Sequence, residues 1–449
     1  MTPKDILIEE EMNFAVRDSG SRSMCAPGRN VNASIEPRTS TEACDGVTTR
    51  VVTTIDEIEE QLRTLWTSFE GHRDGDIDFY LEYIQASSNT VRPHVIVVCR
   101  HGQPSALLAG RLDRTRVDHR LGYVRIPSAR SRALMFMGFR GEETPENCTL
   151  ILKSLLASLR NAEADYAQIP TIHDSEIYRA ALQLPSFLCR DHVPEMSQNH
   201  ILRITGDFDQ VYGQLSANLK EQLRRKKKKI HTDFPGSAEF VCYMQASDLE
   251  IAISHIEEIA RRSYQRGLGV GFSDTESMRR RLQFCAAKGW LRAFVAYLGG
   301  QPAAFAIGTV CNKTYTSDFL GFDPQYRDYS VGTVLQSILM ERCCEEGVQV
   351  MDFSAGHADY KRRFGNATMT VARVYVFAPH CKGVYLNSVK TLAAGANKAG
   401  KYVLANTGFL PKIKRALRSR ATSRASRSAK STELLKQTSH KGISQRTQP

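Results

Sequence analysis

Two blocks of the chain repeat the same succession of apolar and polar positions. An apolar, β-rich run at residues 94–99 leads into GQPSALLAG from Gly102, and a similar run at 291–297 leads into GQPAAFAIG from Gly300. The two turn segments are identical at five of nine positions, at an offset of 198 residues. Strand, tight turn at glycine and strand is the pattern of a hairpin. The chain therefore predicts a duplicated unit.

Both blocks continue in the same order. A third strand is predicted at 134–137 and 315–320, and a helix with apolar positions three and four apart at 150–160 and 331–346. A short strand follows, at 164–169 and 348–353. Gly138-Phe139 matches Gly321-Phe322, and Leu152, Ser154 and Leu156 match Leu335, Ser337 and Leu339, at an offset of 183. The change of offset predicts an insertion in a connecting loop of the first copy.

The predicted fold is α/β (α+β): two tandem domains, each with a mixed, mostly antiparallel sheet flanked by helices. The first domain spans 49–200 and the second 201–380. A helical extension is expected at 381–417, with an amphipathic helix over 390–405. Residues 1–48 and the basic tail 418–449 lack apolar periodicity, so both are expected to be disordered.

Charge is concentrated in two segments of the 449-residue chain. The net charge is +12, but Lys220–Lys229 (KEQLRRKKKK) carries +6 and Pro411–Pro449 carries +10, which leaves −4 for the rest. The protein is thus a mildly acidic body with two basic segments. This distribution indicates an anionic partner that meets one or both of them.

Cysteine usage and the N-terminus indicate the cytoplasm. The eleven cysteines form no CxxC pair and lie mostly in apolar runs, so we expect reduced thiols and no metal site. The first twenty residues are acidic where a signal peptide is basic, and no run reaches the length of a membrane helix.

The loop before the second helix has the composition of an anion-binding site. Backbone N–H groups at a helix start, with a glycine that lets a ligand approach, can hold a phosphate group. The alternative is an ordinary helix that Ser330 caps. The candidate cofactor-binding residues are Tyr326, Arg327, Ser330, Gly332 and Thr333.

A second group of polar residues follows the strand at 348–353. An acid near the end of a buried strand, then a glycine-containing turn with ionisable side chains, is typical of catalytic sites. Asp352 or His357 could accept a proton from an amine, and Tyr360 could protonate a leaving thiolate. Alternatively, Asp352 caps the loop and Tyr360 packs in the core. The candidate catalytic residues are Asp352, His357, Tyr360 and Lys361.

The basic segments admit two interpretations. The predicted helix over 215–230 is either a solvated surface helix or an electrostatic guide for an anionic substrate, with Arg224, Arg225, Lys226 and Lys227 as guiding cations. Neither it nor the tail has the interleaved aromatics of a base-stacking surface, so nucleic acid other than tRNA is not expected. The tail is predicted to be a flexible tether to an anionic membrane surface or polyanion.

Together the hairpin, DPQYRDYSVGTVL, VMDF and GHADYKRRFG resemble the GNAT superfamily. The similarity is to its double-domain branch, which includes the CelD-like acetyltransferases and the FemAB-type peptidyltransferases. It implies direct transfer of an acyl group to an amine, with Tyr360 and Lys361 at the substrate or leaving group and Asp352 or His357 as base. It also implies a non-catalytic first copy.

The resulting hypothesis is an N-acyltransferase that uses acetyl-CoA or another acyl-CoA and no metal. Its acceptor would be an amine of a cell-envelope or polysaccharide precursor, either a small molecule or a lipid- or nucleotide-linked one. The alternatives are an aminoacyl-tRNA-dependent transferase of the FemAB type and a non-catalytic anion sensor on the same fold. A cytoplasmic location is expected, with membrane association through the tail.

Overall fold

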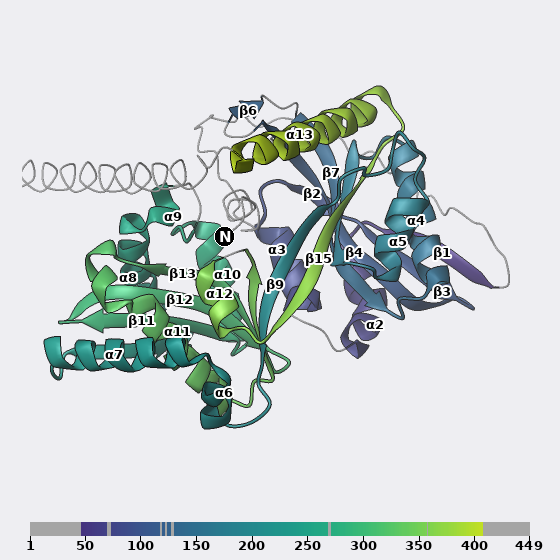
Figure 1. Ribbon diagram of the computed structural model, residues 1–449. Coiled ribbons are helices and arrows are strands. Elements are labelled where there is room, and N and C mark those ends of the chain that lie inside the picture. The colour runs from purple at the N-terminus through teal and green to yellow at the C-terminus, as the bar shows by residue number, and fades with distance from the viewer. Residues whose placement is uncertain are drawn as a thin grey trace, which may run out of the picture. The chain divides into compact units, whose positions relative to one another are not determined.

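The structure, a computed structural model, describes residues 46–69, 73–116, 119–121, 124–126, 130–267, 271–356 and 358–406 (Figure 1). These residues form two compact units. The C-terminal unit contains Ser197–Thr370, and the N-terminal unit contains residues 46–196 and Val371–Lys398. The predicted disordered tails lie outside the described residues, except residues 46–48, of which Val47 and Thr48 form the start of the first strand.

The C-terminal unit is built on six strands in the order β9-β14-β13-β12-β11-β10. Neighbouring strands are antiparallel except β13 and β14, which are parallel. Their bounds are β9 Glu195–Arg203, β10 Ala238–Tyr243, β11 Leu291–Leu298, β12 Gln301–Cys311, β13 Thr314–Phe322 and β14 Val350–Ala355.

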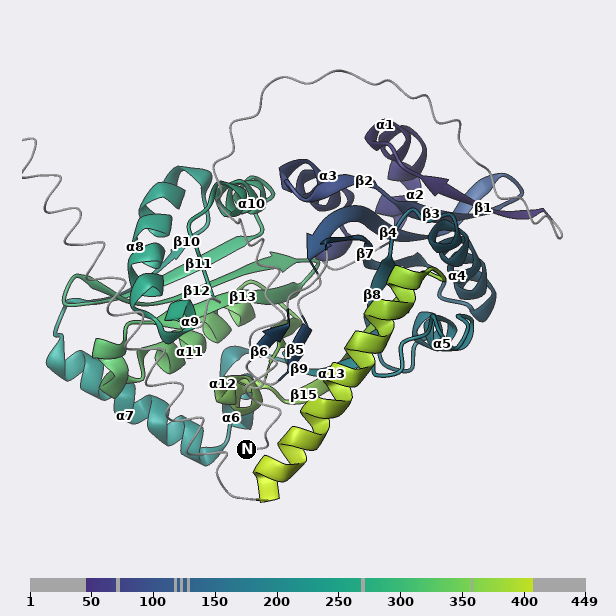
Figure 2. The ribbon, with the colours of Figure 1, turned by 90° about the horizontal axis from the view of Figure 1, so that it is seen from above.

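Helices cover both faces of this sheet. Figure 2 shows α8 (Leu249–Arg262) and α10 (Glu276–Ala287) on one side, and α11 (Val331–Glu345) with the basic helix α7 (Ala217–Asp233) on the other. The apolar positions of α11 and the three buried residues of α7 share one core with the sheet. The shorter elements are α6 Phe208–Gln214, η4 Ala246–Asp248, α9 Tyr264–Gly267, η5 Pro324–Tyr329 and α12 Asp359–Phe364.

The N-terminal unit repeats this plan in the strand order β1-β3-β4-β7-β8-β15, with β2 paired to β4 and β5 to β6. Its strands are β1 Val47–Val52, β2 Thr90–Pro93, β3 Val95–Arg100, β4 Gln103–Arg116, β5 His119–Leu121, β6 Val124–Ile126, β7 Arg130–Gly141, β8 Tyr166–Ile172 and β15 Ala367–Phe377. Its helices are α1 Ile55–Glu57, η2 Ile58–Leu62, α2 Arg63–Ser68, η3 Arg73–Gly75, α3 Ile77–Ala86, α4 Pro145–Arg160 and α5 Glu176–Gln183, followed by α13 Cys381–Asn406.

The duplication predicted from the sequence is present in the structure. β12 and β4 each carry a register shift at the same place, after Ile307 and after Ala109, which keeps the offset of 198. The parallel pairing begins at Thr314 in one unit and at Ala133 in the other, an offset of 181. The sequence match of Gly138-Phe139 with Gly321-Phe322 is therefore two residues out of register. The predicted insertion is the segment that carries β5 and β6.

The last strand of each unit comes from the other half of the chain. β9 follows α5 of the first copy but pairs with β14 of the second. β15 follows α12 of the second copy but pairs with β8 of the first, from Val371 to Phe377. Neither sheet is complete without this exchanged strand.

Candidate active site

The parallel strands β13 and β14 separate soon after they meet. Three residue pairs join Thr314–Thr316 to Val350–Asp352, and β13 then continues to Phe322 beside β12. Where β13 leaves β14, the register with β12 shifts by one residue and Asp318 is the extra residue of a bulge. The strands therefore diverge from an apex at Thr316 and Asp352.

Polar side chains gather at this apex. Thr316 and Asp352 are paired, so their side chains leave the same face of the sheet. The Asp352 carboxylate accepts hydrogen bonds from the backbone N–H of Ser354 (2.7 Å) and from the Asn199 amide (3.4 Å to Oδ2). Asp318 accepts a hydrogen bond from Arg281 of α10 at 2.8 Å. We call Asn199, Arg281, Thr316, Asp318 and Asp352 the apex cluster.

The turn after β14 is held by the lysine that the sequence predicted to be catalytic. Lys361 donates a hydrogen bond to the carbonyl of Ala355 at 2.6 Å and lies 3.4 Å from that of Ser354. Ser354, at φ 58°, donates its hydroxyl to the Ser317 carbonyl of β13 at 2.7 Å. The Lys361 ammonium is thus turned back onto the strand end that carries Asp352. His357 lies outside the described residues.

Tyr360 lies on the other face of β14 from Asp352. Its ring packs edge-on against Phe353 at 6.2 Å, and Phe353 and Asp352, as neighbours in a strand, point to opposite faces. Tyr315, fully buried on the Phe353 side, has a pKa well above its usual value, mainly because of burial and in smaller part because of its neighbours, Tyr360 among them. A proton acceptor and a proton donor can therefore act from opposite faces of the divergence.

Helix α11 begins with two unpaired backbone donors, of which Gly332 is partly exposed and Val331 is buried. Ser330 adopts a left-handed conformation (φ 49°), its side chain makes no capping bond, and the first turn holds no acid. The N–H groups of Thr333 and Val334 bond the Ser330 carbonyl, whereas those of Val331 and Gly332 have no hydrogen-bond partner among the described residues. A Cβ on Gly332 would meet only Phe322, at an ordinary contact distance of 3.9 Å, so nothing crowds the backbone on this side of Gly332. This geometry fits an anionic group.

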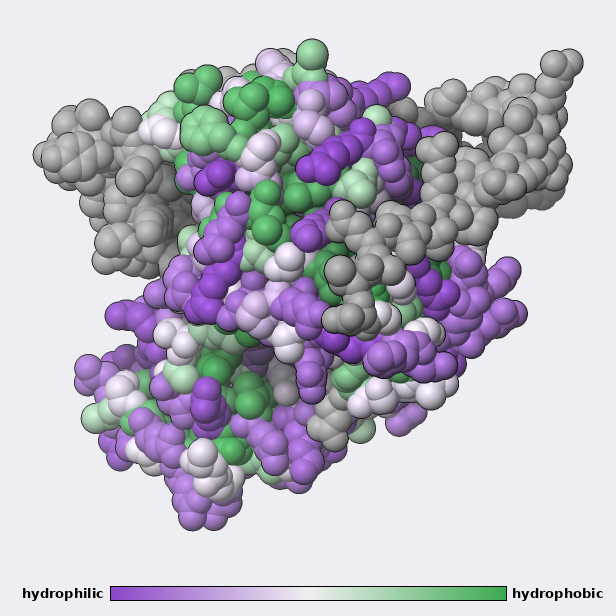
Figure 3. Space-filling view, turned by 90° about the vertical axis from the view of Figure 1, so that its right-hand side faces the viewer, coloured by the Kyte–Doolittle hydropathy of each residue, from purple (hydrophilic) through white to green (hydrophobic). Residues whose placement is uncertain are grey.

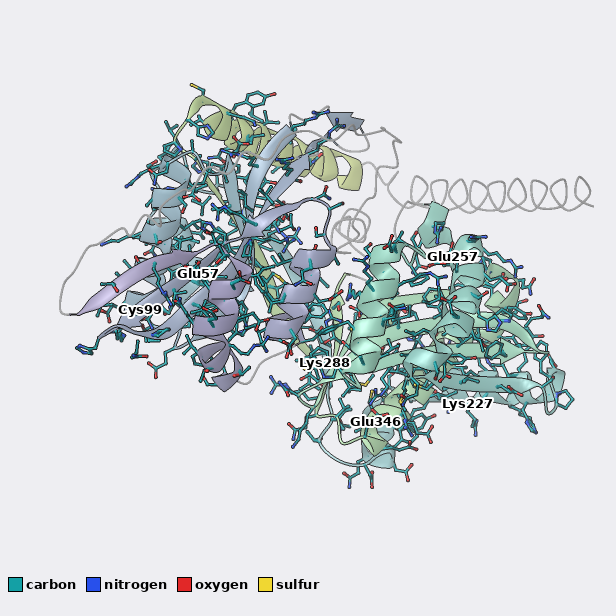
Figure 4. All side chains as sticks on the ribbon, turned by 180° about the vertical axis from the view of Figure 1, so that it is seen from behind. Glu57, Cys99, Lys227, Glu257, Lys288 and Glu346 are labelled. Carbon is teal, nitrogen blue, oxygen red and sulfur yellow. The ribbon has the colours of Figure 1, made fainter. Side chains whose placement is uncertain are left out.

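The basic helix α7 lies beside this loop. Lys226 donates a hydrogen bond to the Asp328 carbonyl, and the Lys229 ammonium lies 4.7 Å from the centre of the Tyr329 ring. Lys226 and Lys227 are half-buried, with Lys227 labelled in Figure 4, whereas Arg224 and Arg225 are exposed. Two of the four guiding cations predicted from the sequence thus face solvent.

The five residues predicted to bind a cofactor occupy different environments. Tyr326 is buried, with its ring 6.4 Å from that of Phe234, so it packs in the core beneath the loop. Arg327 is exposed, and Ser330, Gly332 and Thr333 are partly exposed at the start of α11. Sequence reasoning missed Asp318, Arg281 and Asn199; the signal for Asp318 was a Ser-Asp pair inside the otherwise apolar strand TYTSDFLGF.

Comparison with known proteins finds a family model that matches part of the chain. Residues 217–362 match the family model of the acetyltransferase (GNAT) domain, Acetyltransf_6. This segment contains the divergence, the start of α11 and the apex cluster except Asn199. Residues 217–362 thus form a domain similar to the GNAT acetyltransferases, the superfamily that the sequence resembles. No curated protein matches it significantly.

Several solved structures are similar at low identity. FemX has 10% identity and a TM-score of 0.45, and covers 65% of this chain and 90% of its own. The C-terminal domain of a putative lysylphosphatidylglycerol synthetase from Agrobacterium fabrum has 11% identity and a TM-score of 0.44, and the match covers 75% of this chain and 96% of that one. A tandem GNAT protein of the clavulanic acid biosynthesis pathway has 10% identity and a TM-score of 0.42, and the match covers 74% of this chain and 99% of that one. Similarity at this level is too weak to indicate a substrate.

Two further properties concern cofactors and membranes. In the ranges that the structure describes, no three His, Cys, Asp or Glu side chains are grouped as a metal would require. Among the helices of the same ranges, none combines the length and the mean hydropathy of a membrane span.

Proposed function

We propose that the protein is an N-acyltransferase that uses an acyl-CoA donor at the β13–β14 divergence of its C-terminal unit. One observation carries this proposal: the divergence has carboxylates at its apex and an unpaired, partly exposed N–H group, that of Gly332, where β13 leads into α11. A donor with an acyl thioester at one end and phosphates at the other matches that polarity.

The residues at the α11 end fit the phosphates of such a donor. The N–H group of Gly332 is unpaired and partly exposed, the first turn carries no acid, and a side chain at Gly332 would meet only Phe322. Lys226 and Arg327 place positive charge nearby. Bound there, an acyl-CoA supplies the activated acyl group.

The apex residues then act on the acceptor. Asp352 takes the proton that the amine loses as it attacks the acyl carbonyl. Arg281 forms an ion pair with Asp318, two residues along β13 from Thr316. Backbone N–H groups of β13, released from pairing with β14, stabilise the oxyanion, a contribution of about 3 kcal/mol per donor in other acyl transfers. Tyr360 protonates the departing thiolate. No covalent intermediate on a cysteine is required.

For the acceptor we propose an amine of a cell-envelope or polysaccharide precursor, which the family resemblance implies. Calorimetry with acetyl-CoA and longer acyl-CoAs tests the donor, and thiol release with a panel of amino sugars and lipid-linked amines tests the acceptor. We expect micromolar binding of an acyl-CoA. A folded protein that binds none of them would contradict the CoA donor.

A second donor is favoured by one feature of α7. The exposed Arg224 and Arg225 lie outside the residues that contact η5, so the positive surface extends beyond the loop. An aminoacyl-tRNA could use that extension. Transfer that RNase abolishes would establish this donor, and RNase-insensitive transfer would exclude it. A non-catalytic anion sensor would keep its biological effect in Tyr360→Phe.

A further inference from the structure

Helix α13 has an uncharged outer face. The exposed residues of its first sixteen positions are Cys381, Tyr385, Ser388, Leu392, Gly395 and Ala396, which at 100° per residue form one stripe. Tyr385 is 58% and Leu392 72% exposed. The outer face of a surface helix ordinarily carries charged residues. This stripe therefore indicates that another molecule covers the outer face of α13.

The loop after α5 adds two apolar side chains beside α13. Phe187 and Leu188 are 68% and 58% exposed. The buried amide of Asn387 fixes the loop to α13, because it donates hydrogen bonds of 2.9 Å to the carbonyls of Leu188 and Arg190. Figure 3 shows hydrophobic side chains gathered at the top of the N-terminal unit, at the height where α13 lies in Figure 1. We call Phe187, Leu188, Tyr385 and Leu392 the α13 patch.

The lysines of this region form ion pairs within the unit. Lys390 bonds Asp191 at 2.7 Å, and Lys382 bonds Asp165 at 2.8 Å. The excess positive charge lies instead in the 43 residues that follow α13, from Thr407 to Pro449, which hold eleven Lys and Arg and one Glu. The helix that bears the exposed apolar residues thus continues from Leu392 to Asn406 and leads into a strongly basic segment.

We propose that the α13 patch docks on a bilayer that contains anionic phospholipids, with the basic segment 407–449 held at its surface. Stable attachment without a membrane span takes two signals, a buried apolar group and an electrostatic one, and this region supplies both. A second protein would equally cover apolar residues, but the adjoining charge of +10 selects an anionic surface. The proposal does not depend on the acyl donor or acceptor.

The test is sedimentation of the full chain with vesicles of phosphatidylcholine alone and with added phosphatidylglycerol. We expect binding to the anionic vesicles. The double substitution Tyr385→Glu with Leu392→Glu should weaken it at least about tenfold, since each change removes a large apolar side chain from the interface. Ile251→Glu on α8, also at an exposed apolar position (55%), is the matched control and should bind like the wild type.

A spectroscopic variant locates the contact. The emission of Leu392→Trp should shift to the blue on anionic vesicles and be quenched by brominated lipid. Unchanged emission at saturating lipid, or wild-type binding by the double variant, would overturn the proposal. A concentration-dependent dimer that the double variant abolishes, without vesicle binding, would overturn it in favour of a second copy. Acyl transfer to a soluble amine should be unaffected in the double variant.

Discussion

Helices α4 and α11 occupy equivalent places in the two units but begin in opposite ways. In α4, Thr144 caps the N–H of Asn147, and Pro145 and Glu146 fill the first turn. Arg100 binds both Glu146 and Asn147. In α11, the cap makes no side-chain bond, no acid is present and Gly332 leaves the surface open.

The residues at the apex of the diverging strands also differ between the two units. The pair Thr316–Asp352 of the C-terminal unit corresponds to Met135–Gln168, the last parallel pair of the N-terminal unit. The bulge residue Asp318 corresponds to Met137. The two units thus share one scaffold. The C-terminal copy has carboxylates at the apex and unpaired N–H groups at the start of its helix. The N-terminal copy has apolar or neutral residues at the apex, and its helix is capped by its own side chains. The two copies therefore share a backbone architecture and differ in a few side chains at the apex and at the helix start.

The largest effect should come from the apex. Asp352→Asn keeps the shape of the side chain but removes the proton acceptor, so kcat should fall by about 10²–10⁴ while the acyl-CoA Kd stays near that of the wild type. Steady-state kinetics and calorimetry measure the two quantities. Gln168→Glu, at the equivalent place in the N-terminal unit, is the control. If Asp352→Asn retains full kcat, the base lies elsewhere.

Placing an acid at the start of α11 should make it resemble α4. Gly332→Glu puts a negative charge beside the proposed phosphate site, and the repulsion should weaken acyl-CoA binding on the order of 100-fold. Gly213→Glu in α6, where a Cβ also meets open space, should leave the Kd unchanged. Equal affinity of Gly332→Glu and wild type would remove the helix start from the binding site.

Low pH should destabilise the N-terminal unit because of the buried His94. Burial, with a smaller effect of Arg92, lowers the pKa of His94 to about 3. The unfolded chain therefore binds a proton below about pH 6.5 that the folded unit does not, and stability falls as the pH drops from 6.5 towards 3. At pH 5 the loss is roughly 2 kcal/mol.

The two tryptophans separate the units in this experiment. Trp66 lies in α2 of the N-terminal unit and Trp290 precedes β11 of the C-terminal one. Urea unfolding of Trp290→Phe, followed by the Trp66 emission, should show the acid sensitivity, and His94→Gln should reduce it. The same sensitivity with and without His94 would assign it to other groups.

The smallest effect should come from α7. Lys226→Met removes the bond to the Asp328 carbonyl and one charge near the loop, so acyl-CoA binding should weaken about fivefold and depend less on salt. Lys228→Met, exposed on the same helix, is the control. Identical salt dependence in both variants would indicate that α7 acts through its total charge.

The sequence predicted the duplication and most elements because hairpins and helices are local patterns. It placed the helix at 331–346, which is observed at Val331–Glu345, and began the equivalent one at 150, five residues after the observed start at Pro145. The exchange of β9 and β15 was not predictable, because it depends on pairing between segments about 150 and 200 residues apart in the chain.

The candidate site was predicted in part for a similar reason. Asp352 and Gly332 stand in local motifs that the sequence displays. Asp318 was missed because only the bulge, a property of strand pairing, takes it out of an ordinary strand. Lys361 was expected at the substrate, but its bond to Ala355 depends on a turn geometry that spacing does not reveal.

Hydrogen exchange with and without acetyl-CoA, or the acyl-CoA that binds most tightly, tests the central claim most directly. We expect slower exchange at the backbone N–H groups of residues 317–334, from the divergence to the first turn of α11, and no change at residues 135–148 around the start of α4. Protection at the start of α4, or none at the start of α11 under saturating ligand, would contradict it.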